Sequence, residues 1–230
     1  MKRSKINAAI RRLEGLAKEH GFLLPPFCNW SPEEWLNKDH TYEEIRQTML
    51  GWDVTDFGKG NFDEIGFTLL TIRNGIPNHA EYHKPYAEKL LMLEEGQYAP
   101  MHFHWYKMED IINRGGGTIL IKVYNATPEE GLADTPVTVL MDGRRYVVPA
   151  GTEVSLAPGE SITIPPYLYH DFHVKPGTGA VLLGEVSMCN DDTNDNRFYE
   201  ELGRFPEVEE DEAPYRLLCN EYPPAAESAQ

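Results

Sequence analysis

The sequence predicts a mainly β protein, a sandwich or barrel of short strands preceded by a helical segment. Two observations support this prediction. From about Phe57 onward, short apolar and β-branched runs recur between glycine- and proline-rich turns, with no helical periodicity between them. Before that point, the apolar residues recur at the three-to-four spacing of amphipathic helices.

The first helix is expected over residues 4–20, where polar and apolar side chains fall on opposite faces. Gly21 is expected to end it, because glycine commonly follows the last helical residue. The apolar face, which should pack on the rest of the protein, comprises Ile6, Ala9, Ile10, Leu13, Leu16 and Ala17.

Two capping-box sequences predict further helices. Ser31–Glu34 combines a capping serine, a proline and a capping glutamate, and Thr41–Glu44 precedes a helix that should end near Gly51. Residues 1–56 are therefore predicted to form a helical segment packed on a barrel with a C-terminal tail, residues 57–230, as one structural domain. The helical segment is also a candidate dimerisation arm.

The strands alternate with turn signals along the rest of the chain. Between two of them, Asp142-Gly143 is a strong signal for a type I′ hairpin. The expected strands are Gly66–Ile72, Glu88–Leu93, Tyr98–His104, Gly117–Tyr124, Val137–Met141, Arg145–Val148, Thr152–Leu156, Ser161–Ile164, His170–Val174 and Ala180–Val186.

Charge and composition narrow the possible partners. The 230-residue chain has 37 acidic and 21 basic side chains, a formal net charge of −16, which repels phosphate backbones and anionic membranes. The sequence therefore predicts no nucleic-acid and no membrane partner, and it favours a small neutral ligand such as a monosaccharide. No apolar run approaches the length of a membrane span.

The cysteines indicate the compartment. Cys28, Cys189 and Cys219 are few, odd in number and far apart, which argues against a disulfide framework. The N-terminal residues lack the apolar core of a signal peptide. We therefore expect a cytoplasmic protein.

A histidine pair followed by a carboxylate suggests a metal site. His102 and His104 should lie on one face of a strand, because strand side chains alternate, and Glu109 follows five residues later. The glycines at 115–117 would let the backbone turn back. A His-X-His pair alone is a weak signal, because most such pairs are structural.

The spacing around this pair resembles the first metal motif of the cupin superfamily, with glycines at Gly96 and Gly116. A counterpart of the second motif follows at Gly159, Pro165 and His170. The resemblance implies a cupin double-stranded β-helix, or jelly-roll, barrel. It also implies a metal bound by His102, His104, Glu109 and His170.

The second motif departs from the family pattern. A glycine of the family is Tyr167 here, so we expect the turn before His170 to form without a positive φ, and an asparagine is Val174. His173 competes with His170 as a ligand, but a position three residues along a strand faces the opposite side.

Three imidazoles and one carboxylate suit a divalent ion, and Mn²⁺, Zn²⁺, Co²⁺, Ni²⁺ and Fe²⁺ all accept such ligands. The alternative is that these four residues fill a polar barrel core without a metal.

A closer resemblance involves the strings His102–Gly117, Gly184–Ser187, Asn190–Asp192 and Asp195–Phe198. They are similar to the D-lyxose isomerase family, and the resemblance extends over nearly the whole chain. It implies a manganese-preferring homodimer that interconverts D-lyxose with D-xylulose and D-mannose with D-fructose.

Two residues are the candidate catalytic groups. Lys107 lies between the ligands in sequence and can donate a proton, although a surface position is the alternative. Glu185 is a candidate base if its side chain faces inward. The expected reaction is proton transfer through a metal-held cis-enediolate, and a hydride shift is the rival route.

The polar segment after the last predicted strand is expected to bind sugar hydroxyls, although such loops usually face solvent. Its candidate substrate-binding residues are Asp192, Asp195 and Arg197, and a carboxylate of this loop could also replace Glu185 as the base.

Two other functions use the same barrel. An iron-dependent cupin dioxygenase has the same ligand set, but its pocket should be mostly apolar, whereas Lys107 and Glu185 make this one polar. A non-catalytic sugar-binding cupin would bind a sugar without turnover.

Overall fold

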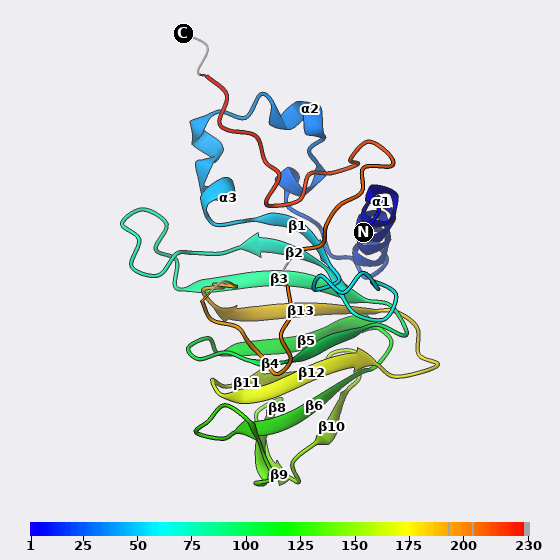
Figure 1. Ribbon diagram of the computed structural model, residues 1–230, viewed down its shortest axis with the longest axis vertical. Coiled ribbons are helices and arrows are strands. Elements are labelled where there is room, and N and C mark those ends of the chain that lie inside the picture. The colour runs from blue at the N-terminus through cyan, green and yellow to red at the C-terminus, as the bar shows by residue number, and fades with distance from the viewer. Residues whose placement is uncertain (193, 204, 228–230) are drawn as a thin grey trace.

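Two antiparallel sheets pack face to face, with the helices gathered at one end of the larger sheet (Figure 1). The computed structural model describes residues 1–192, 194–203 and 205–227. Within them, the larger sheet has eight strands in the order β1 (Gly51–Thr55), β2 (Phe67–Arg73), β3 (Tyr86–Leu93), β13 (Val181–Met188), β5 (Glu109–Gly116), β11 (Ser161–Ile164), β8 (Val137–Met141) and β9 (Arg144–Val148). The smaller sheet has six: β10 (Thr152–Leu156), β6 (Ile119–Ala126), β12 (Leu168–Val174), β4 (Tyr98–Phe103) and β14 (Arg197–Phe198), with β7 (Leu132–Ala133) beside β6.

The space between the sheets holds the main core. Leu91 and Leu183 from the larger sheet and Ile121 and Phe172 from the smaller one belong to a single buried cluster. Alternate residues of each strand face this core, as the period of a strand requires. The architecture is the mainly β, jelly-roll barrel that the sequence predicts.

The helices are short apart from the first. No helix in the described part of the chain is long and apolar enough to cross a membrane. The helical elements are α1 (Arg3–Glu19), η1 (Pro26–Asn29), α2 (Pro32–Trp35), η2 (His40–Tyr42) and α3 (Glu43–Gln47).

Helix α1 covers the outer face of the larger sheet, as Figure 1 shows. All six residues of its predicted apolar face are buried, and they share a cluster with Leu70, Leu90 and Leu182 of the sheet. The prediction of an amphipathic first helix is therefore confirmed. This packing gives the larger sheet a second core on the side away from the barrel interior.

The C-terminal tail holds α1 in place through a buried arginine. One terminal nitrogen of Arg3 lies 2.6 Å from Glu210 Oε1 and 2.5 Å from Glu221 Oε1. The Arg3 side chain is only 3% exposed. The first helix and the C-terminal tail are thus joined on one side of the barrel.

One capping prediction is confirmed and the other is wrong. Ser31 and Glu34 form a complete capping box. The Thr41 sequence forms none, because the Asp39 side chain accepts the hydrogen bond from the Thr41 backbone N–H. Helix α3, capped at Tyr42 without a side-chain bond, is only five residues long and ends before the expected position.

Four of the described strands were not predicted: β1, β5 and the two-residue strands β7 and β14. Strand β1 starts at Gly51, so the sheet begins within the segment that was expected to be helical. Strand β5 includes Gly115 and Gly116, two of the three glycines that were expected to form a turn. A Cβ atom at Gly116 would lie 2.2 Å from the carbonyl oxygen of Ala180, so glycine lets β5 approach β13 where their register shifts.

The hairpin between β8 and β9 is confirmed. Asp142 and Gly143 both have positive φ angles, 49° and 77°, as a type I′ turn requires.

Candidate metal centre and catalytic pocket

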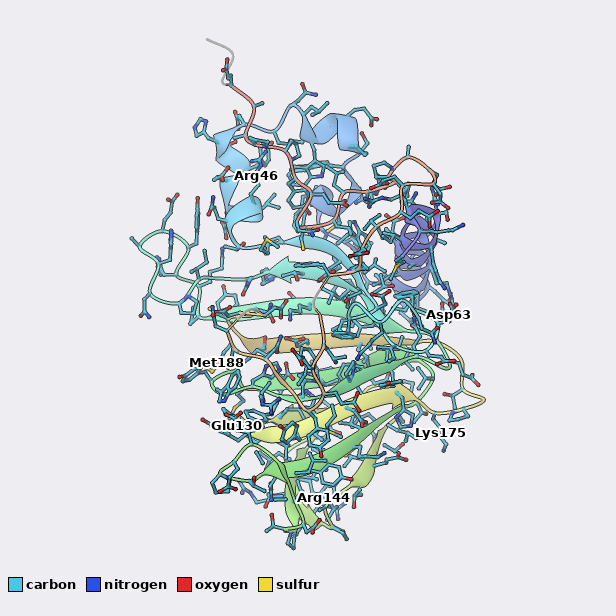
Figure 2. The ribbon with its side chains drawn as sticks, viewed as in Figure 1. Arg46, Asp63, Glu130, Arg144, Lys175 and Met188 are labelled. Atoms are coloured by element: carbon cyan, nitrogen blue, oxygen red, sulfur yellow. The ribbon has the colours of Figure 1, made fainter. Side chains whose placement is uncertain are left out.

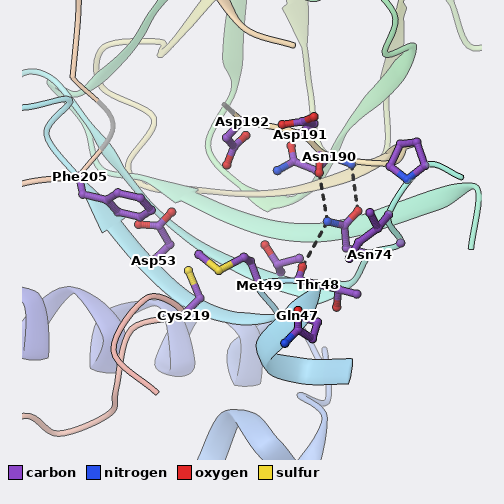
Figure 3. Close-up of a pocket in the computed structure, with 14 residues that line it drawn as sticks. Gln47, Thr48, Met49, Asp53, Asn74, Asn190, Asp191, Asp192, Phe205 and Cys219 are labelled. Atoms are coloured by element: carbon purple, nitrogen blue, oxygen red, sulfur yellow. Dashed lines mark hydrogen bonds between the residues drawn. The ribbon is translucent and has the colours of Figure 1, made fainter. Parts of the chain in front are cut away.

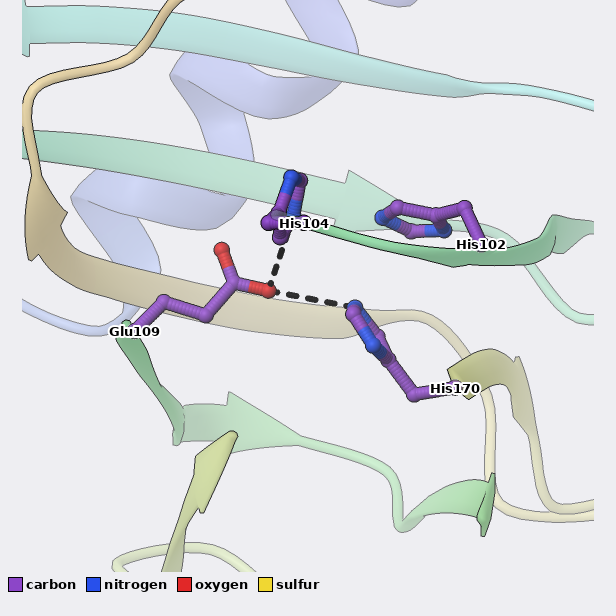
Figure 4. Close-up of side chains that lie close together, drawn as sticks. All are labelled: His102, His104, Glu109 and His170. Carbon is purple, nitrogen blue, oxygen red and sulfur yellow. Dashed lines mark ion pairs between the residues drawn. The ribbon is translucent and has the colours of Figure 1, made fainter. Parts of the chain in front are cut away.

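Four side chains from three strands and a turn converge inside the barrel (Figure 4). His102 belongs to β4, His104 follows that strand, Glu109 begins β5, and His170 lies on β12 directly opposite His102. One ligand atom from each of the four lies within 4.8 Å of the others. The structure therefore brings together the full set of predicted metal ligands.

The Nε2 atoms of two histidines point at the Glu109 carboxylate. Glu109 Oε1 lies 3.1 Å from His170 Nε2 and 3.5 Å from His104 Nε2. Both Nε2 atoms are buried, and neither has a hydrogen-bond partner among the described residues. Buried polar atoms without partners are costly, and a bound cation would satisfy both of them.

Each histidine is held in the ring form that can bind a metal. The Nδ1 atoms lie 2.7, 2.6 and 3.0 Å from the backbone oxygens of Pro100, Asp195 and Leu168, respectively. A carbonyl oxygen only accepts, so each Nδ1 carries the proton and each Nε2 keeps its lone pair. These residues fit a divalent metal ion.

Burial keeps the His102 ring neutral. It holds the pKa of His102 well below its ordinary value, and the neighbouring His170 and His104 act in the same direction. A neutral imidazole is the form that binds a metal.

The turn before His170 differs from the expectation. Tyr167 has a φ of 60°, so the turn uses a positive φ although the residue is not glycine. Stacking of the Tyr167 ring on Phe103, with centroids 5.2 Å apart, accompanies this conformation. His170 points into the cluster, whereas His173 is partly exposed, with Nε2 3.9 Å from Glu153.

Lys107 is buried and bridges two carboxylates. Its Nζ lies 2.6 Å from Glu109 Oε2 and 3.0 Å from Glu185 Oε1, and the lysine is 4% exposed. The surface alternative for Lys107 is therefore wrong. Burial alone would lower the pKa of Lys107 and raise that of Glu109, but their mutual attraction prevails, raising the former and holding the latter well below its ordinary value.

Glu185 faces inward, and its contacts fall on one oxygen. Besides Lys107, Ser187 Oγ donates to Oε1 at 3.0 Å, and Lys89 Nζ lies 3.4 Å from the same atom. Among the described residues, no hydrogen bond reaches Oε2. Glu185 thus has a held oxygen and a second oxygen that can act on a bound molecule.

Sequence reasoning missed Lys89, which is buried on β3 directly across from Glu185. Part of the signal was present, because Lys89 lies within a predicted strand, directly before its apolar run Leu90–Leu93. What the sequence lacked was the pairing of β3 with β13, which joins strands far apart in the chain.

A cavity of about 60 Å³ adjoins the cluster. That is well below the roughly 300–1,000 Å³ of typical small-molecule pockets, so its walls have to shift to admit a sugar. Asp192 and Asn196 contribute polar groups, and the cavity also has an aromatic wall comprising Phe57, Phe67, Phe172 and Phe198.

The other predicted substrate-binding residues contact the protein itself. Arg197 Nε donates to Glu130 Oε2 at 3.0 Å, at the rim of the barrel where Figure 2 labels Glu130. Both carboxylate oxygens of Asp195 accept backbone N–H groups, from Tyr106 and Lys107. Neither Asp195 nor Arg197 lines the cavity at the cluster.

A second cavity of about 320 Å³ lies nearby, and Asp192 lines both cavities (Figure 3). Within it, the amide of Asn74 donates to the backbone oxygens of Thr48 and Asn190, and the Asn190 N–H donates back to Asn74 Oδ1. The Asn190 side chain in turn accepts from Lys89. The start of the segment after β13 is thereby fixed beside the catalytic pocket.

Comparison with known proteins shows the family of the chain. The D-lyxose isomerase family matches residues 1–222 of the chain. Proteins named D-lyxose/D-mannose isomerase, from Serratia proteamaculans and Escherichia coli O157:H7, are 48% and 47% identical to it over 223 residues, which is 96% of this chain and 98% of each relative.

Solved structures of low sequence identity share the fold. The L-ribose isomerase of Acinetobacter sp. DL28, in complex with L-ribose, is 13% identical, with a TM-score of 0.59 over 90% of this chain and 98% of its own. That of Cellulomonas parahominis, with L-ribose, is 16% identical, with a TM-score of 0.57 over 98% and 97%.

Fold and site together define a cupin-type barrel with a three-histidine, one-glutamate cluster beside a lysine–glutamate pair. The two L-ribose isomerases share the fold of this barrel. The chain belongs to the D-lyxose isomerase family, and it is an aldose–ketose isomerase. This membership decides against both the dioxygenase and the non-catalytic sugar-binding alternatives.

Proposed function

We propose that this protein is a metal-dependent isomerase that interconverts D-lyxose with D-xylulose and D-mannose with D-fructose. The observation that supports it best is the position of Glu185, a buried carboxylate with one uncommitted oxygen on the wall of the cavity beside the cluster. The two substrates are those in the names of relatives that share about half of the sequence.

The metal ligands would be His102, His104, Glu109 and His170, and Mn²⁺ is the proposed ion. When bound, a divalent ion of this kind supplies a Lewis acid that makes the proton on C2 of an open-chain aldose more acidic. Three neutral imidazoles and one carboxylate leave such an ion with a net positive charge.

Glu185 is the proposed base. Its Oε2 takes the proton from C2 of the sugar and returns it to C1, which converts the aldose to the ketose by way of a cis-enediolate. Lys107 moves a proton between O1 and O2. Lys89 and Ser187 keep the other Glu185 oxygen fixed, so that the base does not rotate away from the substrate.

The rest of the pocket binds and shields the sugar. Asp192 and Asn196 have polar groups suited to sugar hydroxyls, and the phenylalanine wall excludes water and packs on C–H faces. The hydroxyl-rich but uncharged substrate agrees with the net charge of −16.

The test is metal removal and replacement. We expect protein stripped with a chelator to lose ketose formation from both D-lyxose and D-mannose, and Mn²⁺ to restore it. Failure of Mn²⁺, Co²⁺, Zn²⁺, Ni²⁺ and Fe²⁺ alike to give a ketose from either aldose would refute the proposed function.

The homodimer is also a proposal, supported by exposed apolar side chains at one end of the larger sheet. Met188, labelled in Figure 2, pairs across strands with Tyr86, and they are 50% and 46% exposed. Val186 and Met108 are each 44% exposed nearby, and such patches often mark interfaces. Sedimentation should give a dimer that Met188→Glu weakens.

A reducing compartment such as the cytoplasm is the proposed location. No disulfide joins the cysteines within the described residues, and Cys28 and Cys219 are buried.

A further inference from the structure

We propose that Asp195 is a positioning residue that sets the ring form of His104, fixes the turn containing Lys107, and thereby raises the affinity of the cluster for a divalent metal. The inference rests on the metal dependence in the proposed function, but it assigns Asp195 a role apart from sugar binding. Two different groups of the residue, its backbone oxygen and its carboxylate, act on the site.

The backbone oxygen distinguishes His104 from the other ligands. His102 and His170 find their Nδ1 acceptors two residues earlier on their own strands, at Pro100 and Leu168. His104 Nδ1 instead donates to the oxygen of Asp195, 91 residues away in sequence, at 2.6 Å. Among the three rings, only His104 therefore depends on a distant segment for its orientation.

The carboxylate fixes the turn between β4 and β5. Its Oδ1 accepts the Tyr106 N–H at 2.9 Å, and its Oδ2 accepts the Lys107 N–H at 2.9 Å. Asp195 is 7% exposed and Lys107 is 4% exposed, so the Lys107 N–H would otherwise lose its partner within the protein interior. With both oxygens occupied, the carboxylate has little capacity left for a sugar hydroxyl.

Strand β14 brings Asp195 to this place. Arg197 pairs with Phe103 and Phe198 with His102 in an antiparallel register. Continuing that register by two residues places Asp195 level with Trp105, between His104 and the turn that it holds. The segment that follows β13 thus closes on the strand that holds two of the ligands.

The chemical consequence follows from the ligand form of histidine. A metal binds Nε2 only when the proton is on Nδ1, and a carbonyl acceptor on Nδ1 selects that form. Loss of such an outer partner typically weakens metal affinity 10- to 100-fold. Asp195→Asn removes one of the two carboxylate acceptors and places an amide N–H₂ against a backbone N–H, so it should loosen the whole contact.

The test uses the full chain labelled with ¹⁵N-histidine and stripped of metal. In the wild type, NMR should show the proton on Nδ1 of all three rings. In Asp195→Asn, His104 should lose this preference while His102 and His170 keep it, and the Kd for Mn²⁺ in titration should rise 10- to 100-fold. The control is Asp191→Asn in the same segment, because within the described residues the hydrogen bonds of the Asp191 carboxylate go to Asn194. This change should alter neither value.

An unchanged His104 ring form or an unchanged Kd for Mn²⁺ in folded Asp195→Asn would overturn the proposal. If that variant does not fold, the wild type still decides, because a His104 ring without its proton on Nδ1 contradicts the assignment. Wild-type protein that binds Mn²⁺ tightly but isomerises neither sugar would refute the proposed function and leave the role of Asp195 standing.

Discussion

At the scale of single residues, the two carboxylate oxygens of Glu185 have different surroundings. Lys107, Ser187 and Lys89 all approach Oε1, and within the described residues no hydrogen bond reaches Oε2. Contacts to a single oxygen restrict the rotation of a carboxylate. In the proposed mechanism, this arrangement keeps Oε2 directed at the substrate.

Replacing Glu185 should slow catalysis strongly without weakening metal binding. We expect Glu185→Gln to lower kcat about 10²- to 10⁴-fold, the usual contribution of a general base, while the Kd for Mn²⁺ stays within a few-fold of wild type. Steady-state kinetics and metal titration measure the two quantities. Glu153→Gln, on the exposed part of β10, is the control, and an active Glu185→Gln enzyme would assign the base elsewhere.

Lys89 should affect catalysis indirectly, by positioning Glu185. Lys89→Met removes a cation beside Glu185 and the donor to Asn190, so kcat should fall roughly 10- to 100-fold through misplacement of the base. The matched change Lys122→Met, at a half-exposed surface pair with Glu153, should leave kcat unchanged. Equal rates for the two variants would mean that Lys89 does not position Glu185.

The two histidines of β12 should behave differently. His170→Ala should weaken Mn²⁺ binding by at least roughly 100-fold, because it removes a ligand rather than an outer partner. His173→Ala should leave affinity and activity near wild type, because His173 faces outward beside Glu153. Titration of each metal-free variant with Mn²⁺ is the measurement, and the opposite ranking would move the fourth ligand to His173.

At the scale of elements, the site depends on how strands pair. The alternation of His102 and His104 could be read from the sequence, since it is a property of one strand. The approach of Glu185 and Lys89 could not, because β13 and β3 are about ninety residues apart and only their register, Glu185 to Lys89, brings the side chains together. Local pattern predicted the candidate ligands, and long-range strand pairing placed Lys89 beside Glu185.

Tyr167 and Gly116 show the limits of local rules. A tyrosine at the position of a family glycine suggested a turn without positive φ, yet Tyr167 adopts a φ of 60° and its ring stacks on Phe103. The glycines of β5 suggested a turn, yet they let that strand approach β13. In both cases tertiary packing decided the conformation.

The contact between α1 and the C-terminal tail should respond to acid. Arg3 holds the pKa of Glu210 below its ordinary value, so the stabilisation is present above the unfolded carboxyl pKa and is lost as the pH falls through the folded one. Arg3→Met should cost about 1–2 kcal/mol at pH 7, a value discounted for the exposure of the two carboxylates, and much less at pH 3.5.

Urea unfolding at the two pH values tests this contact. The difference in free energy of unfolding between wild type and Arg3→Met should shrink as the pH falls. Lys5→Met, which removes a mostly exposed pair with Asp63, is the control and should cost well under 1 kcal/mol at either pH. A difference that stays constant with pH would mean that Arg3 acts through packing alone.

At the scale of the whole molecule, one barrel brings together the histidine–glutamate cluster, the Lys107–Glu185 pair and an aromatic wall. The strand and turn pattern predicted the fold class, and the amphipathic pattern predicted α1. Other features depend on contacts between distant parts of the chain. They are the pairing of the edge strand β1, the contact of Asp195 with His104, and the contact of Arg197 with Glu130. Those contacts have no local signature that a single sequence displays.

The central claim is that a protein carboxylate moves a proton between C2 and C1, and one measurement tests it most directly. D-Lyxose labelled with deuterium at C2 is converted by the Mn²⁺-loaded enzyme in ordinary water, and NMR follows the label in the ketose. Proton transfer by Glu185 predicts loss of most of the deuterium to solvent during turnover. Complete retention of the deuterium at C1 would contradict the account and establish a hydride shift instead.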